Sequence, residues 1–320
     1  MTHFIIKDPT STIAAYKSGQ VLRPIAISGL TPLQMLELQK DLEQTHTTYW
    51  AGPTGLRGLV LNTSKAPFND KRVRHAISLA INRQSIIQTM SGGMEMLGTP
   101  LPPGLWFSYT EEEAAQFPGF RQLDGEKHPE DIAEAKRLME AAGYPDGFDV
   151  ELATRSSAGG DYADIVALVA EQLKKYLNIN ATLKLYDSAA GYAQYDLGNF
   201  QFFAQGSSFN LADPDGVMRR YHEKTTFARW AGGGAVGQGW VPEGVQELHL
   251  QQTAELDEEK RKELILKIND IFVNEDNGYV GLYWSVRAMP IDKRIQGFHM
   301  EPTIYGDLKH EHIWCDPACD

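Results

Sequence analysis

The feature that most constrains the fold is an alternation of helix-like and strand-like segments in the middle of the chain. The segments are, in order, a helix at 129–142, a strand at 148–152, a helix at 161–177, a strand at 181–186, a helix at 188–197 and a strand at 200–204. Apolar residues recur at helical spacing in the helices and alternate with polar ones in the strands. A strand, a helix and a strand in this order predict a parallel crossover and therefore an α/β fold.

A second strong pattern follows a predicted strand at 56–63. Five apolar residues fall at helical spacing and predict one buried face, namely Val73, Ala76, Ile77, Ala80 and Ile81. We expect Lys71, Arg72 and Arg74 to lie on the opposite, solvated side. Asn82 is placed to cap the next helix. Further expected elements are a helix ending at 17–19, a strand at 24–30, a helix at 33–42, an irregular segment at 98–126, helices at 243–254 and 257–275, and a strand at 279–286.

Bulk properties limit the class of protein. The 320 residues are enough for two lobes, and the 42% hydrophobic content allows a sizeable core. The formal charge of −12, without a long basic run, argues against a nucleic-acid partner. The sequence contains no apolar stretch near the roughly 20 residues that span a bilayer. Its first residues also lack the pattern of a signal peptide, which taken alone favours a cytoplasmic protein.

The usual catalytic and metal-binding motifs are absent from the sequence. We find no phosphate-binding glycine loop, no nucleophile elbow and no His-Glu-x-x-His motif. Asp213-Pro214-Asp215 fits a turn and helix cap better than a catalytic carboxylate pair. Cys315 and Cys319 allow a small disulfide loop, and the nearby His310 and His312 allow a metal site, but their spacing fits no common zinc pattern. We therefore predict no enzyme activity, no metal and no cofactor.

Three segments in a fixed order resemble one known family. The first contains Pro67-Phe68-Asn69-Asp70, Arg72-Val73-Arg74 and Asn82-Arg83; the second contains Ala142-Gly143-Tyr144-Pro145-Asp146-Gly147-Phe148; the third contains Asp213-Pro214-Asp215, then Tyr283-Trp284 and Gly297-Phe298. Together they resemble the peptide/nickel-type solute-binding proteins, family 5, the extracytoplasmic components of ABC importers. Asn82 stands where that family usually has Asp.

The resemblance implies an α/β fold like that of periplasmic binding proteins (type II, cluster C), with one complete lobe and part of the second. Residues 1–60 would form part of lobe I and the crossover, 61–285 lobe II, and 286–320 the return to lobe I. Members of the family are longer at the N-terminus and carry a signal peptide, so the resemblance implies that this chain is truncated at its N-terminus. The full-length parent is therefore expected to be periplasmic or extracytoplasmic and monomeric, with ABC permease subunits as partners.

Ligands of open α/β sheets bind beyond the carboxyl ends of the strands. We therefore predict binding residues in the loops after 148–153 and 200–204, together with one face of the aromatic strand. They are Arg155, Ser207, Ser208, Phe209, Asn210, Asp213, Tyr283 and Trp284. Tyr283 and Trp284 are adjacent, so only one of them can face each side of the sheet, and core packing is the alternative for both. A solvated loop charge is the alternative for Arg155.

By the resemblance, peptide-binding relatives have an aromatic residue and then an Asp where this chain has Ser207 and Asn210. A peptide ammonium without its counter-ion is costly to bury. The sequence therefore favours a neutral or hydroxyl-rich ligand, such as an oligosaccharide, or a modified peptide, unless the charge comes from the absent part of lobe I. The main hypothesis is a non-catalytic receptor for peptides or a similar polar solute. A sensory module is an alternative, although a DNA-binding motif is absent, and a hydrolase is the least favoured.

Overall fold

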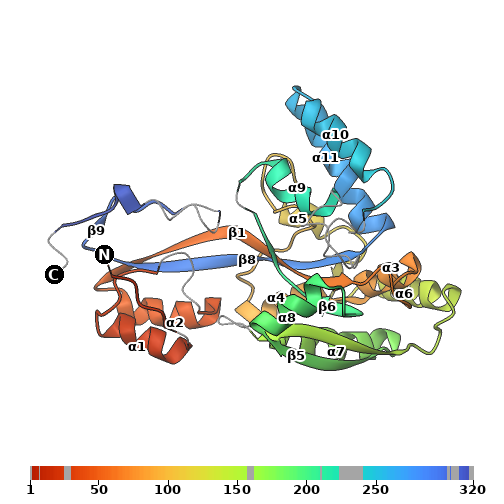
Figure 1. The fold of residues 1–320 in the computed structure, drawn as a ribbon, viewed down its shortest axis with the longest axis horizontal. Helices are drawn as coiled ribbons and strands as arrows, with labels where there is room; N and C mark the ends of the chain where they lie inside the picture. The colour runs from red at the N-terminus through yellow and green to blue at the C-terminus, as the bar shows by residue number, and fades with distance from the viewer. Residues whose placement is uncertain are drawn as a thin grey trace.

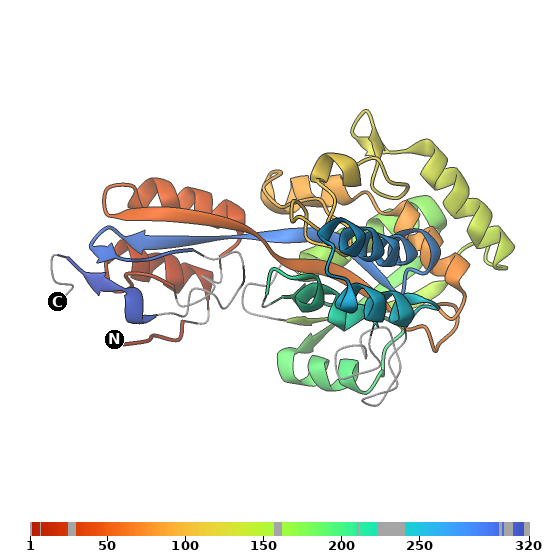
Figure 2. The ribbon, with the colours of Figure 1, turned by 90° about the horizontal axis from the view of Figure 1, so that it is seen from above.

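The computed structural model describes residues 2–6, 8–24, 30–156, 162–209, 211–222, 241–300, 303 and 310–316. Figure 1 shows a large body and a smaller one, joined by a two-stranded ribbon. The ribbon consists of β1 (His46–Leu61) and β8 (Tyr279–Asp292), which pair antiparallel from His46↔Asp292 to Val60↔Tyr279. Figure 2 shows the same two bodies from a second direction, with both strands of the ribbon running between them. Most of the strand expected at 24–30 lies outside the described residues.

The large body is built on a mixed sheet. Its order is β5-β4-β6-β1-β7, with β8 also paired to β1; the strands not yet bounded are β4 (Asp149–Ser156), β5 (Asn180–Asp187), β6 (Phe202–Ala204) and β7 (Ser207–Ser208). Strand β4 runs parallel to β5 and to β6, which confirms the predicted parallel crossover. Strand β1 is antiparallel to β6, so the ribbon enters the sheet against the direction of the crossover strands.

Helices pack on the sheet, and most of their bounds are close to those expected. They are α3 (Lys71–Ala80), α4 (Arg83–Ser91), α5 (Glu111–Ala114), α6 (Pro129–Ala141), α7 (Tyr162–Leu177), α8 (Ser188–Asp196), α9 (Pro214–His222), α10 (Val245–Ala254), α11 (Glu258–Asp270) and a short π-helix, η2 (Ile271–Glu275). Helices α5 and α9 lie in segments for which helix bounds were not predicted. Asn82 caps α4 by accepting from the Ser85 amide at 3.2 Å, as predicted. Between α5 and α6 lies a small hairpin, β2 (Gln122–Leu123) with β3 (Glu126–Lys127).

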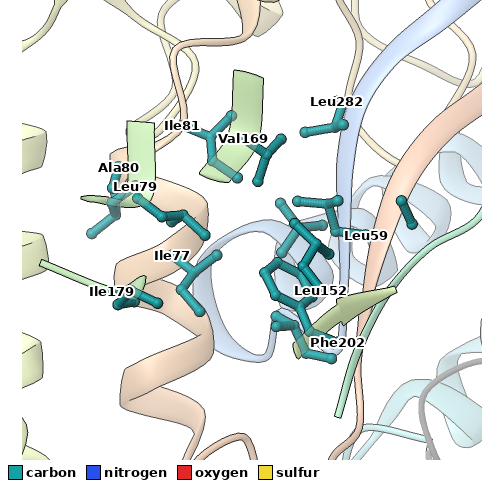
Figure 3. Close-up of a cluster of buried hydrophobic side chains, with 14 of the residues drawn as sticks. Leu59, Ile77, Leu79, Ala80, Ile81, Leu152, Val169, Ile179, Phe202 and Leu282 are labelled. Atoms are coloured by element: carbon teal, nitrogen blue, oxygen red, sulfur yellow. The ribbon is translucent and has the colours of Figure 1, made fainter. Parts of the chain in front are cut away.

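The core confirms the apolar face predicted for the helix after residue 70. Side chains from α3, α7 and the sheet meet in the cluster drawn in Figure 3, including Ile77, Ile81, Val169, Leu152 and Phe202, each 1% exposed or less. A second cluster contains the sheet residues Leu56, Val60, Phe203 and Trp284. Because strand residues alternate in direction, the two clusters bury both faces of the sheet. The sheet is therefore interior rather than a half-exposed layer.

The expectation that Arg74 is solvated is wrong. Its side chain is buried, its Nη1 donates to the Phe68 carbonyl at 2.7 Å, and its Nη2 pairs with Asp276. Asp276 follows η2 and comes from far along the chain, so helical periodicity gave no sign of this partner. Lys71 and Arg72 are exposed, as predicted.

The smaller body combines segments from both ends of the described chain. Helices α1 (Pro9–Lys17) and α2 (Pro32–Leu42) pack on the outer half of the ribbon, and β9 (Ile295–Gln296) pairs with β10 (Trp314–Cys315). Tyr16, Met35 and Leu38 form its core with Ala288 of β8. The boundaries drawn at 60/61 and 285/286 therefore fall inside two continuous strands.

The terminal segment is only partly described. His310 and His312 lie in a single 3-10 turn, Cys315 is disulfide-bonded, and Cys319 is outside the described residues. Within the described ranges, groups of three or more His, Cys, Asp or Glu side chains suited to a metal do not occur. A helix long and apolar enough to cross a bilayer is likewise absent from the part of the chain that the structure describes.

Candidate ligand-binding site

The register of β1 gives the direction in which the predicted binding residues lie. Along β1, Phe202 pairs opposite Leu61, Ala204 opposite Leu59, and Ser208 opposite Gly55. The chain of β6 and β7 thus proceeds along β1 toward the smaller body, which holds the N-terminal half of β1 (Figure 1). Since β4 is parallel to β6, its carboxyl end points the same way. The carboxyl ends of β4 and β6, and β7 after them, therefore lie at the edge of the large body that faces the smaller one.

Arg155 is held at this edge, but not as a solvated loop charge. It lies within β4 and is 7% exposed. Its Nε donates to Gln205 Oε1 at 3.1 Å and its Nη1 donates to Ser188 Oγ at 3.1 Å. Its guanidinium carbon lies 3.8 Å from the centre of the Tyr192 ring. Because Gln205 follows β6 and Ser188 opens α8, Arg155 ties two neighbouring strands and a helix together.

Two glycines allow the aromatic rings and the guanidinium to approach so closely. A Cβ on Gly191 would lie 2.3 Å from Cγ of Arg155, and a Cβ on Gly206 would lie 2.3 Å from the Tyr162 hydroxyl. Such contacts are too short for real atoms, so any side chain there would displace Arg155 or Tyr162. We name Arg155, Gln205, Ser188, Tyr192 and Tyr162 the Arg155 cluster.

The serines of the second loop lie beside this cluster. Ser207 and Ser208 form β7 and pair with Leu56 and Gly55; Ser207 is buried and Ser208 is half-buried. Phe209 turns inward and packs edge-on against Trp284, with ring centres 5.8 Å apart. Asn210 lies outside the described residues. The loop thus presents hydroxyls near the edge and puts its aromatic residue in the core.

Tyr283 and Trp284 lie on opposite faces of the sheet, as their adjacency requires. Tyr283 belongs to the first core cluster and Trp284 to the second, and both are nearly fully buried. The Trp284 indole Nε1 donates to the Thr99 carbonyl at 2.8 Å. Both rings take the core-packing position in this arrangement, and their role in binding stays a prediction.

Asp213 takes the role of a turn and helix cap. Its Oδ1 accepts from the Asp215 amide at 2.9 Å, and its carboxylate lies 3.4 Å from both terminal nitrogens of Arg261. Asp215 accepts from Gln252 Nε2 at 2.6 Å. The two carboxylates therefore hold α9 against α10 and α11.

We expect Asp213→Ala to lower the free energy of unfolding by about 1 kcal/mol, the usual effect of losing an N-cap. Chemical denaturation measures this change. Asp187→Ala is the matched control, because Asp187 is the N-cap of α8 and makes no side-chain cap bond. Equal losses in the two variants would contradict the capping role of Asp213.

Four members of the Arg155 cluster were not predicted. Gln205 directly follows the strand expected at 200–204. The rule that ligands bind beyond the carboxyl ends of strands, which indicated Arg155, therefore applied to Gln205 as well. Tyr162 stands in the first turn of α7, where the helical pattern marked only core positions. Ser188 and Tyr192 come from α8, and sequence gave no sign that this helix lies over the end of β4.

The sequence matches a known family over most of its length. Residues 2–228 match the bacterial extracellular solute-binding proteins, family 5 Middle. The chain belongs to this family. This match confirms the family predicted from the sequence. The family consists of solute receptors rather than enzymes.

Individual relatives and solved structures are similar to this chain over ranges of different length. The oligopeptide-binding protein OppA of Bacillus subtilis is 22% identical over 299 residues, which are 93% of this chain and 52% of OppA. Heme-binding protein A of Haemophilus influenzae is 34% identical over 94 residues, 29% of this chain and 15% of that protein. The structure of AgaA from A. tumefaciens R10 with agropinic acid superposes with a TM-score of 0.77 at 22% identity, covering 97% of this chain and 59% of AgaA. This chain thus spans little more than half the length of the relatives that it matches most fully, and its fold is that of a partial solute-binding protein.

Proposed function

We propose that this chain is the ligand-binding part of an extracytoplasmic receptor that delivers a peptide or a similar polar solute to an ABC importer. Binding is non-covalent, the partners are the permease subunits of the importer, and the receptor works in the periplasm or outside the cell. The observation that carries the proposal is the polar edge described above. Arg155, Gln205, Ser207 and Ser208 meet at the carboxyl ends of β4, β6 and β7, on the side toward the smaller body.

The relatives do not fix the ligand, because their names cover heme, oligopeptides and agropinic acid. The choice of ligand therefore has to be argued from the residues at this edge. Arg155 repels an ammonium group, so this edge is poorly suited to the free N-terminus of a peptide. Hydroxyls at Ser207 and Ser208, and a Tyr192 ring that is 45% exposed, suit an oligosaccharide as the second candidate.

We expect a true ligand to raise the melting temperature of the chain. Binding to the folded state at one hundred times Kd adds about 2.7 kcal/mol to the free energy of unfolding. The panel consists of tripeptides, N-acetylated tripeptides, galacturonate, galactose and short oligosaccharides, measured by thermal unfolding and then by calorimetry. Acetylated peptides or sugars should act at lower concentration than peptides with a free N-terminus. The proposal fails if the whole panel leaves the melting temperature unchanged.

A further inference from the structure

We infer that Arg155 is the subsite for a carboxylate of the ligand, so that the solute carried by this protein is an acid. This inference rests on the proposed function and narrows it. The receptor would recognise one carboxylate group, whether it belongs to the C-terminus of a peptide or to a sugar acid.

The first argument is the lack of a counter-ion. Arg155 is 7% exposed, yet all of its contacts with described residues are to neutral groups: the amide oxygen of Gln205, the hydroxyl of Ser188 and the tyrosine rings. Among the described residues, acidic side chains do not come within ion-pair distance of it. Burying an arginine without a negative partner is unfavourable by several kcal/mol. An anionic ligand would remove that cost when it binds.

The second argument is the direction of the free donors. A guanidinium has five N–H donors, and here Nε and Nη1 are engaged by Gln205 and Ser188. Within the described part of the chain, Nη2 faces no acceptor. The planar fork of arginine can hold a carboxylate in a bidentate manner. The contacts already made fix the plane of the fork, because Tyr192 stacks on it at 3.8 Å.

The third argument is a second cation at the same place. Arg57 of β1 is half-buried, and its guanidinium lies 5.2 Å from the centre of the Tyr162 ring. Arg155 lies 6.0 Å from the centre of that same ring. Two arginine guanidiniums thus lie near one tyrosine ring at this edge. An anion bound to Arg155 would therefore lie near a second guanidinium as well.

The alternative is that Arg155 only fastens α8 to the sheet. That role needs a hydrogen-bond donor and does not depend on the charge of any ligand. The two roles therefore differ in one measurable quantity, the preference for an acid over its neutral analogue.

The test measures binding of matched pairs by calorimetry to the whole chain. The pairs are N-acetyl-trialanine against its C-terminal amide, and galacturonate against its methyl ester. The wild-type chain should bind the acid of at least one pair about 10- to 100-fold more tightly than the neutral analogue, the usual effect of a charge-assisted hydrogen bond. Arg155→Gln should bind acid and neutral forms with similar affinity, because the charged partner of the carboxylate is lost. Arg137→Gln, on an exposed helix face, is the control and should keep the preference.

Arg155→Lys separates folding from recognition, because it keeps the charge and loses the fork. It should keep part of the preference even if Arg155→Gln proves too unstable to purify. The inference is overturned if the wild-type chain binds acid and neutral forms equally, or if a folded Arg155→Gln keeps the preference; in both cases the proposed receptor function stands. If neither member of either pair binds, and the wider panel also fails, the receptor function itself is overturned.

Discussion

Asp131→Asn should lower the free energy of unfolding by about 3–5 kcal/mol, the usual effect of removing one partner of a buried ion pair. Asp131 is 1% exposed and accepts from three donors: Lys127 Nζ at 2.9 Å, Arg121 Nε at 2.8 Å and the Gly119 amide at 2.8 Å. Lys127 is itself buried, so the variant leaves an ammonium group without a counter-ion. The loss would release the β2–β3 hairpin from α6.

Urea denaturation followed by circular dichroism measures this loss. Glu130→Gln is the matched control, because Glu130 pairs with the same Arg121 from an exposed position, and exposed pairs contribute little. We expect less than about 1 kcal/mol there. A loss of similar size in both variants would show that burial of the ion pair does not matter.

The stability that Asp131 provides should depend on pH in a defined window. Burial opposes its ionisation, but hydrogen bonds from Lys127, Gly119 and Arg121 outweigh burial and lower its pKa from the usual 3.8. A carboxyl whose pKa is lower in the folded state stabilises fully above its unfolded pKa and loses this effect as pH falls through the folded one. The difference in unfolding free energy between wild type and Asp131→Asn should therefore shrink as pH falls below about 4. A difference that stays constant down to pH 3 would contradict this account.

Phe202→Ala should cost about 3–5 kcal/mol, the range for deleting a large buried aromatic side chain. Phe202 is 0% exposed and lies at the centre of the sheet, between β4 and β1. Its ring lies 5.5 Å from that of Phe68, and Figure 3 shows it beside Leu152. The surrounding strands would keep open the cavity left by the missing ring, because their backbones are fixed by the hydrogen bonds between strands.

The same denaturation experiment tests this variant. Leu183→Ala is the control, because Leu183 lies on the edge strand β5 and is 43% exposed. It should cost much less than Phe202→Ala. If Phe202→Ala were as mild as the control, the sheet would have to relax around the lost ring, and the tight core described above would be wrong.

Local pattern was enough to predict the crossover and the principal helices. Val73, Ile77 and Ile81 lie on the buried face because helical spacing alone decides which side of α3 is apolar. The length of the ribbon was not predictable in this way. Residues 46–55 include Pro53 and glycines, which argue against a strand when read locally. They form one because β8 supplies hydrogen bonds along most of their length, with a register shift between Ala51 and Gly55.

The position of Arg155 in the fold was predicted, but its environment was not. Arg155 lies at the carboxyl end of its strand, as the fold rule indicated, but α8 and Gln205 bury it. Periodicity shows which face of a helix is apolar, but it does not show where in the fold the helix lies. The burial of Arg155 by α8 could therefore not be predicted from periodicity. For Tyr283 and Trp284, the sequence did not decide between lining the ligand site and packing in the core. The answer depends on whether the sheet is covered on both faces, which only the assembled structure shows.

The ribbon also has a consequence for the order in which this chain can fold. His46 pairs with Asp292, and Val60 with Tyr279. The pairing of β1 with β8 can therefore form only after most of the chain has been made. Closing so long a loop costs entropy before any ladder bond forms, which makes such pairings slow. The crossover of β4, α7 and β5 is local by comparison and can form while β1 is still unpaired. During synthesis, the part of β1 from His46 to Ala51 therefore keeps an open strand edge until β8 has been made.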